Sequence, residues 1–253
     1  MKYLVIGPGA MGLYAMLGYL KNIENRLSNV EEISGASAGS ILAVLFALEK
    51  SVDEMIDVSL RLNISDLVKL NLKCFLHSYG LIDLDPLRNK FVEICGCDPT
   101  FDELEKKIYI SAFCVNTGKT EYFSVDTHPN MKVLDAVCMS IAIPFVFSSR
   151  KYNGNTYVDG GTIESLPLTP LLDKSPHEVY CIQIKSSIKY NENIDNPRTF
   201  AESIVRSSLE NRYVYDTSRH EVKTIDVENM DIFDFNMCYE DKMKLYLAGM
   251  KTI

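Results

Sequence analysis

Two glycine-rich loops lie within the first fifty residues, and each follows a short apolar segment with the pattern of a buried strand. The first loop, Gly7–Gly12, follows an expected strand over Tyr3–Ile6. The second, Gly35–Gly39, follows an expected strand over Val30–Ser34 and precedes an apolar helix over Ser40–Leu48. Successive strand–loop–helix units favour parallel strands covered by helices. We therefore predict an α/β fold with a mostly parallel central sheet and helices on both faces.

The rest of the chain continues this alternation, with one hairpin. Ser51 and Glu54 form a capping-box pattern that predicts a helix to about Leu62. The further expected elements are hairpin strands over Ile108–Val115 and Thr120–Val125, a helix over Val133–Ala142, a strand over Val179–Ile184, a helix over Phe200–Tyr213, a strand over Val222–Val227 and a helix over Asp241–Leu247. No repeat or linker is evident, so we expect one domain over residues 1–253.

The formal net charge of −8 argues against a nucleic-acid partner, because Lys and Arg dominate affinity for phosphate backbones. The longest apolar stretch, residues 133–147, is interrupted by Asp135 and Pro144, so no transmembrane segment is expected. Seven cysteines at wide spacing, with no signal-peptide pattern, indicate reduced thiols. A soluble protein of the cytoplasm or another intracellular compartment, with peripheral membrane contact at most, is the expectation. No metal-ligand spacing is present.

A nucleophile pattern occupies the second loop. Gly35-Ala36-Ser37-Ala38-Gly39 fits G-x-S-x-G between a strand and a helix. A serine at that place lies on a sharp turn that small neighbours permit, and its hydroxyl is expected to be exposed at the helix N-terminus. Ser37 is therefore the candidate nucleophile.

The first loop allows two interpretations. Its glycines could let a dinucleotide pyrophosphate approach a helix N-terminus, as in a nucleotide-binding oxidoreductase. The same geometry could form an oxyanion hole from backbone N–H groups. A ribose-binding acid should end the second strand, but Glu31 and Glu32 stand before or at its start, and Ser37 follows its end. The sequence favours hydrolysis.

Asp159-Gly160-Gly161 offers a carboxylate on a turn with little side-chain cover, although such a turn is also common without a function. A serine nucleophile needs a base, and histidine is the usual one. The chain offers four histidines: His77, His128, His177 and His220. The α/β-hydrolase order would allow His177 or His220 after Asp159, but those enzymes have more strands before the nucleophile than this chain has.

Together the three glycine-containing segments resemble the patatin-like phospholipase family. That family has a glycine-rich oxyanion loop after the first strand, then G-x-S-x-G about thirty residues on, then D-G-[GA]. This chain has Gly7–Gly12, Gly35–Gly39 and Asp159–Gly161 in that order. Ser140–Phe145 also resembles the family's S-x-A-x-P-x-x-F segment. The resemblance covers roughly residues 1–170.

The resemblance implies a lipid acyl hydrolase, of lipase or phospholipase A type, that uses a Ser–Asp dyad without histidine or cofactor. Ser37 would attack the ester carbonyl and Asp159, partly removed from water, would accept its proton. The implied site residues are an oxyanion loop of Gly7, Gly9, Ala10 and Gly12, elbow residues Gly35 and Gly39, and the base turn Gly160–Gly161. The N–H groups of Gly9 and Ala10 would be the donors, with help from Ala38. A lipid or phospholipid is the implied partner.

Two residues depart from the family pattern. Pro8 replaces one of three adjacent glycines and has no N–H to donate. Met11 stands where the family usually has Arg or Lys. Loss of a needed donor would slow hydrolysis by roughly 10²–10³-fold, so a weakly active, lipid-binding relative is the alternative.

The segment Leu62–Ile82 is apolar and carries few charges. It contains Leu67, Leu70, Leu72, Phe75 and Leu76. Such a segment could be a cap that meets a membrane surface transiently, or a helix packed on the core. The sequence leaves both alternatives open.

Overall fold

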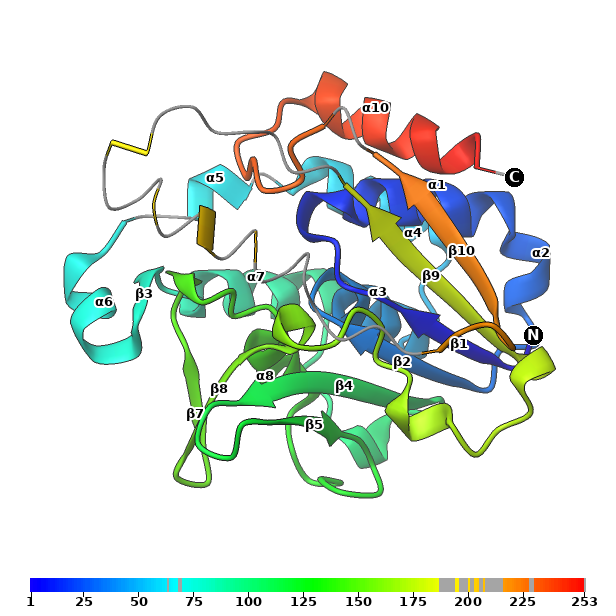
Figure 1. Cartoon of the computed structure of the whole chain (residues 1–253), viewed down its shortest axis with the longest axis horizontal. Coiled ribbons are helices and arrows are strands. Elements are labelled where there is room, and N and C mark those ends of the chain that lie inside the picture. Colours follow the sequence, from blue (N-terminus) through cyan, green and yellow to red (C-terminus); the bar gives the residue numbers. More distant parts are fainter. Residues whose placement is uncertain are drawn as a thin grey trace.

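The computed structural model describes residues 1–62, 64–67, 70–186, 216–227 and 230–252, with six further positions between 194 and 207. Within this part of the chain the main sheet has eight strands (Figure 1). They are β1 (Tyr3–Ile6), β2 (Glu32–Ala36), β4 (Lys107–Cys114), β5 (Lys119–Phe123), β7 (Arg150–Tyr152), β8 (Asn155–Asp159), β9 (Val179–Lys185) and β10 (Glu221–Asp226). Their order is β10-β9-β1-β2-β4-β8-β7, and β5 also pairs with β4.

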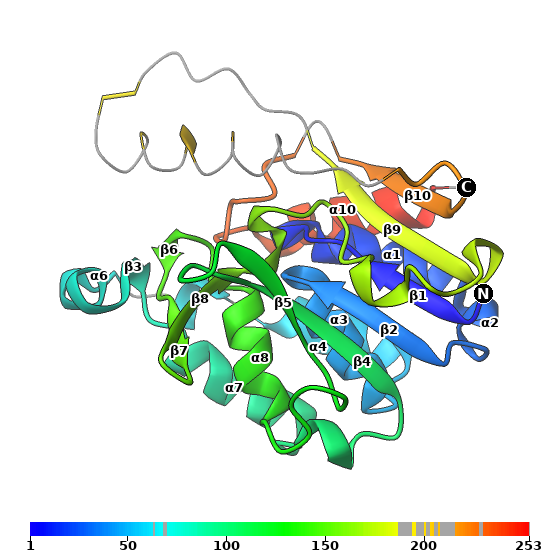
Figure 2. The ribbon, with the colours of Figure 1, turned by 60° about the horizontal axis from the view of Figure 1, so that its bottom comes forward.

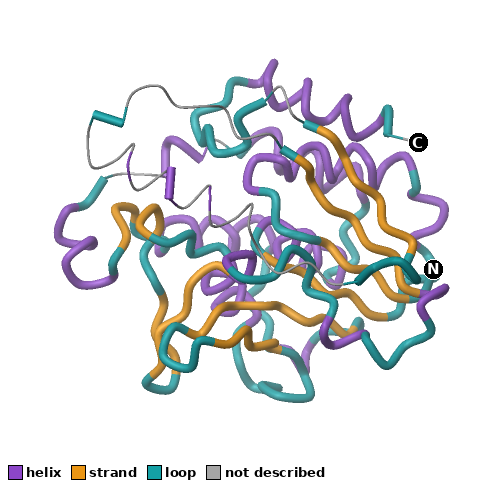
Figure 3. Tube along the Cα trace, viewed as in Figure 1, coloured by secondary structure: helices purple, strands orange, loops and turns teal. Residues whose placement is uncertain are grey.

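Helices flank this sheet, and a second, two-stranded sheet lies beside it (Figure 3). The helices are α1 (Leu13–Asn22), α2 (Glu24–Leu27), α3 (Ala38–Ala47), α4 (Val52–Arg61), α5 (Ile64–Leu67), α6 (Leu72–Ser78), α7 (Asp85–Cys95), α8 (Val133–Ser140) and α10 (Tyr239–Met250). The small sheet pairs β3 (Gly80–Ile82) with β6 (Phe145–Phe147) in parallel.

The predicted fold class is confirmed: the sheet is mostly parallel and flanked by helices. From β10 to β4 every pairing is parallel. The expected hairpin is present as β4 and β5, which pair antiparallel. The chain adds antiparallel pairs of β8 with β4 and with β7, and a short turn at Asn153 and Gly154 joins β7 to β8. Most of the helix expected over Phe200–Tyr213 lies outside the described residues.

The two faces of the sheet are covered differently. Leu4 and Ile6 of β1 join the main core with the α-helices, whereas Val5 between them points to the other face, as strand alternation requires. On that face Val5 packs with Leu166 and Leu171, from a segment that contains the short 3₁₀ helix Thr169–Leu171. Figure 2 views the strands from this side, with the α-helices behind them.

Local signals account for several helix boundaries. Ser51 accepts a hydrogen bond from Glu54 N–H, and the Glu54 carboxylate accepts one from Ser51 N–H, so the predicted capping box opens α4. Helix α7 begins at Asp85, with Leu84 before it and Pro86 in its first turn. The Asp83 carboxylate accepts the Asp85 N–H, which satisfies one of the free N–H groups at the start of the helix.

Helices α1 and α10 lie side by side from opposite ends of the chain (Figure 1). Glycines make this approach possible. A Cβ on Gly249 would lie 1.9 Å from Ala15 O, and one on Gly18 would lie 2.0 Å from Tyr246 O. The backbones of α1 and α10 therefore touch at Gly18 and at Gly249, where the glycine has no side chain.

We predict that Gly249→Ala destabilises the protein, although Gly→Ala usually favours a helix by about 0.5–1 kcal/mol. The new methyl group would push α10 away from Ala15, and overpacking of this kind costs about 1–3 kcal/mol. Urea unfolding measures whether the free energy of unfolding falls, as predicted, or rises. Leu247→Ala, at an exposed position of α10, is the control and should change the unfolding free energy by less than about 1 kcal/mol. A stabilised Gly249→Ala protein would contradict the contact.

Candidate active site

Ser37 occupies a strained turn between β2 and α3. Its φ of 52° and ψ of −123° lie where L-residues are rare. A Cβ on Gly35 would lie 2.5 Å from Gly39 O, and one on Gly39 would lie 2.2 Å from Ile6 O. Neither position therefore has room for a side chain. The expected exposure of Ser37 is wrong: only 5% of the residue is accessible, because helices surround the turn.

Asp159 is the last residue of β8 and is 2% exposed. Gly161 N–H donates to Asp159 Oδ1 at 2.7 Å, which orients the carboxylate. A Cβ on Gly160 would lie 2.2 Å from Ser111 O, and one on Gly161 would lie 2.6 Å from Cβ of Pro8. The turn after Asp159 is thus packed on β4 on one side and on the first glycine loop on the other.

Strand register brings Ser37 and Asp159 to the same place on the sheet. Ala36, directly before Ser37, pairs with Ser111 of β4. Asp159 pairs with the next residue of β4, Ala112. Neighbouring strands lie about 4.8 Å apart, so the chain leaves the sheet at two points that flank β4.

The end of α8 joins both residues through hydrogen bonds. Ser37 N–H donates to Ser140 Oγ at 2.8 Å, and Asp159 N–H donates to Ala142 O at 2.9 Å. Ser140 is fully buried. The sequence contained this segment as part of the family resemblance, but nothing in its pattern indicated that Ser140 accepts a hydrogen bond from the Ser37 turn.

In the first glycine loop, several backbone N–H groups are already used. Gly7 N–H donates to Ile182 O, Gly12 N–H to Gly9 O and Met11 N–H to Ile232 O. Gly9 and Ala10, by contrast, have N–H groups without a hydrogen-bond partner among the described residues. Ala10 has a φ of 44°, which turns the loop sharply at that point.

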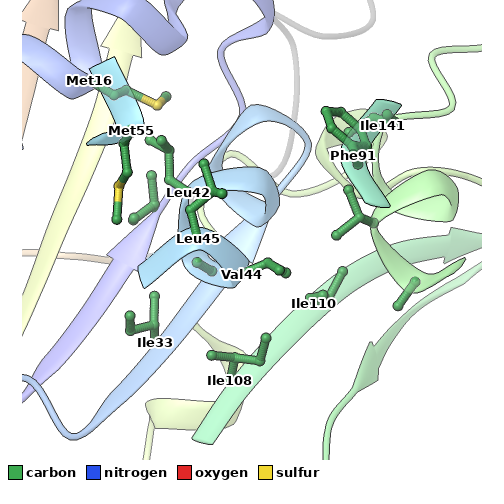
Figure 4. Close-up of a cluster of buried hydrophobic side chains, with 14 of the residues drawn as sticks. Met16, Ile33, Leu42, Val44, Leu45, Met55, Phe91, Ile108, Ile110 and Ile141 are labelled. Carbon is green, nitrogen blue, oxygen red and sulfur yellow. The ribbon is translucent and has the colours of Figure 1, made fainter. Parts of the chain in front are cut away.

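Ser37 also lines an apolar cavity whose wall includes residues of α1, α3, α4, α5, α7 and α8. The residues from α3 and α7 mostly lie three or four positions apart, on one face of each helix. Residues of its wall include Ile41 and Leu45 of α3, Val58 of α4, Phe91 and Ile94 of α7, and Val137 of α8. Figure 4 shows Val44 and Leu45 on α3, with Phe91 beside Ile141. The sequence could not separate these residues from ordinary core, since both show the same periodicity.

The two histidines of the α/β-hydrolase alternative lie at the opposite end of the parallel strands from Ser37. His177 comes two residues before the start of β9 and His220 directly before β10, at the amino ends of these strands. Ser37 follows the carboxyl end of β2, a strand parallel to β1, which pairs in parallel with β9. Neither histidine lines the cavity, so neither is placed to serve Ser37.

The remaining histidines are also away from the cavity. His77 is exposed on α6, and its ring contacts Lys73 O. His128 packs against Phe123, and burial lowers the pKa of its ring. Among the described residues, no cluster of three His, Cys, Asp or Glu side chains could hold a metal ion. In the same part of the chain, no helix has the length and hydropathy to cross a membrane.

Relatives include viral and bacterial proteins. The protein R571 of Acanthamoeba polyphaga mimivirus is 28% identical over all of this chain and 92% of its own length. A probable lipid hydrolase, 463L of Invertebrate iridescent virus 6, is 27% identical over 66% of this chain. A cGAMP-activated phospholipase of Escherichia coli is 26% identical over 64% of it. The alignments span 62% and 51% of these last two relatives.

Solved structures show the same fold. VipD of Legionella pneumophila superposes with a TM-score of 0.68 at 15% identity, over 99% of this chain and 65% of VipD. ExoU of Pseudomonas aeruginosa gives a TM-score of 0.55 at 15% identity, over 100% of this chain and 51% of ExoU. The sequence model described as Patatin-like phospholipase matches residues 4–172, about two thirds of the chain. With that match and the arrangement of the three glycine-containing turns, the chain belongs to the patatin-like phospholipase family.

Proposed function

We propose that this protein hydrolyses carboxylic esters of lipids, with Ser37 as nucleophile and Asp159 as general base. The observation that carries the proposal is the placement of Ser37: a buried serine on a strained turn that opens into an apolar cavity. Ser37 Oγ attacks the ester carbonyl while its proton passes to Asp159, and the alcohol leaves with that proton. Water then attacks the acyl-enzyme and releases the fatty acid.

Backbone N–H groups stabilise the oxyanion in this proposal. Gly9 and Ala10 supply donors, because their N–H groups have no partner in the described part of the chain. Ala38 adds a third donor from the first position of α3, where the helix itself offers no acceptor. Gly7 and Gly12 shape the loop rather than donate, since their N–H groups are already bonded.

The cavity receives the acyl chain. It follows α3 from Ser37 to Leu45, a rise of roughly 12 Å along the helix. An extended chain of about eight to ten carbons spans that length, because each C–C bond of about 1.5 Å advances slightly less than its own length. Asp159 is 2% exposed, so the carboxylate that receives the proton lies away from bulk solvent.

A second candidate is a lipid-binding relative with weak activity. Pro8 has no N–H, and Met11 N–H is bonded to Ile232 O, so two positions of the loop cannot donate to an oxyanion. This candidate keeps the cavity and its acyl chain, but it requires no dyad.

For the dyad, Ser37→Ala and Asp159→Asn should each lower kcat by about 10⁴-fold or more, because neither group can be replaced by water in that geometry. Hydrolysis of a medium-chain nitrophenyl ester and of a fluorescent phospholipid measures the loss. Ser28→Ala and Asp173→Asn, both exposed, are matched controls. Full activity in Ser37→Ala would refute the mechanism, and inactivity of the wild type on both substrates would favour the lipid-binding candidate.

Ser140→Ala should lower kcat by about 10- to 100-fold with little change in KM. Removal of the hydroxyl leaves the Ser37 N–H unpaired and lets the strained turn relax, which moves the nucleophile rather than the bound substrate. Ser140→Thr keeps the acceptor and should recover most of the rate. Ser124→Ala removes an equally buried hydroxyl elsewhere and serves as control. An unchanged kcat in Ser140→Ala would show that the turn needs no such support.

Val58→Phe should shorten the preferred acyl chain. Val58 lies on α4 and forms part of the cavity wall together with Leu45 and Ile94. A larger ring there fills the end of the cavity that is far from Ser37, so kcat/KM for an octanoyl ester should fall about tenfold or more relative to an acetyl ester. Val58→Ala should shift the preference the other way. If both variants kept the acyl-chain preference of the wild type, the acyl chain would have to lie elsewhere.

A further inference from the structure

Large apolar side chains gather on the surface around α6, β3 and β6. This group contains five of the exposed large hydrophobic residues of the described chain. They are Leu70, 69% exposed, Phe75, 39%, Leu76, 75%, Tyr79, 59%, and Phe145, 46%. We call these five residues the α6 surface. The largest exposed apolar patch of a soluble protein is often a functional contact surface.

Backbone pairing holds the α6 surface together although its residues are distant in sequence. Leu70 forms an antiparallel bridge with Ile82 of β3, and Gly80 of β3 pairs with Phe145 of β6. In the sequence, helix α6 lies between Leu70 and β3, and it packs on β3. In Figures 1 and 2 this unit stands at one end of the molecule, away from α1 and α10. Of the two alternatives for the segment Leu62–Ile82, the exposed side chains of α6 fit a surface cap.

The α6 surface and the cavity that Ser37 lines share the segment around β6. Phe145 of β6 is exposed, whereas Phe147, two residues on, is buried and lines the cavity. Ile143, before β6, lines the cavity too. One short segment therefore leads from the surface to the cavity.

The segment that carries most of the α6 surface is locally basic. Residues 70–82 contain no Asp or Glu, and Lys73 and His77 are exposed beside the apolar side chains, whereas the chain carries a net charge of −8. The nearest acidic groups along the chain, Asp83 and Asp85, follow β3, and their charge reaches Cys74 of α6. Apolar side chains next to basic ones match a phospholipid surface, where acyl chains lie beneath phosphate groups.

The size of the α6 surface also favours lipid over protein. Its five side chains expose roughly 500 Å², given the 150–250 Å² that a large side chain can bury. A stable interface between two proteins needs about 800 Å² on each partner. A lipid surface has no such lower limit, since a few inserted side chains are enough for reversible binding.

We propose that the α6 surface docks this protein on a phospholipid bilayer. Leu76 and Phe145 enter the acyl region, and Lys73 and His77 lie at the level of the phosphates. A lipid acyl chain then reaches Ser37 along β6 without crossing water. The purpose of docking rests on the proposed function, but docking itself needs no catalysis.

The test uses the full chain in the Ser37→Ala background, so that binding is measured without hydrolysis. Cosedimentation with phosphatidylcholine vesicles, alone or with phosphatidylserine, gives the bound fraction. Leu76→Asp and Phe145→Asp should each weaken binding about tenfold or more, because a charge replaces an inserted apolar group. Leu172→Asp replaces a leucine that is 53% exposed elsewhere on the protein and should bind like the parent. Thermal melting confirms that each variant folds.

Absence of binding to both vesicle types would overturn the proposal, as would equal binding by Leu76→Asp and Leu172→Asp. A dimer in light scattering that becomes a monomer only in Leu76→Asp, with vesicle binding unchanged, would also overturn it, since the surface would then join two copies of this chain. Ester hydrolysis by the wild type distinguishes failure of the docking proposal from failure of the hydrolase proposal. Vesicle binding that depends on Leu76, in a protein whose wild type hydrolyses no ester, would support docking while the hydrolase proposal fails.

Discussion

Backbone packed directly against backbone is the constraint on which the site depends. Gly39 lies against Ile6 O, Gly160 against Ser111 O and Gly161 against the ring of Pro8. Each contact is closer than any side chain would allow. The Ser37 turn, the first glycine loop and the Asp159 turn are therefore adjacent because glycine occupies the points where they touch, and a methyl group at these points would separate them.

The same packing explains why a strained serine can persist. An unfavourable φ costs about 1–3 kcal/mol and survives only where the surroundings fix it. Here a parallel strand leads into Ser37, a buried helix leads away, and Ser140 Oγ holds its N–H. Ala142 O holds the Asp159 backbone from the same segment. A movement of α8 would thus displace both residues together, which keeps their relative geometry.

The sequence predicted the parts of this arrangement that depend on local chemistry. The two glycine loops predicted the parallel sheet, the capping box at Ser51 predicted the start of α4, and the strand patterns over Ile108–Val115 and Thr120–Val125 predicted the β4–β5 hairpin. It could not predict the support from Ser140 or the use of Met11 N–H by Ile232 O, because these bonds join residues more than a hundred positions apart. The cavity was hidden for a different reason: a helix face that lines a cavity has the same apolar periodicity as one that packs in a core.

The exposure of its side chains decides whether α6 is a core helix or a surface helix. The periodicity of a sequence cannot predict that exposure. A seven-residue helix gains little stability from its own hydrogen bonds and depends on contacts with the rest of the protein. Yet most of its described side chains face outward, and its contacts are with β3. Leu76 is 75% exposed, so a polar residue there would lose little packing. Its apolar character has a cost in solubility, and the proposed contact with a lipid surface would give that cost a physical reason.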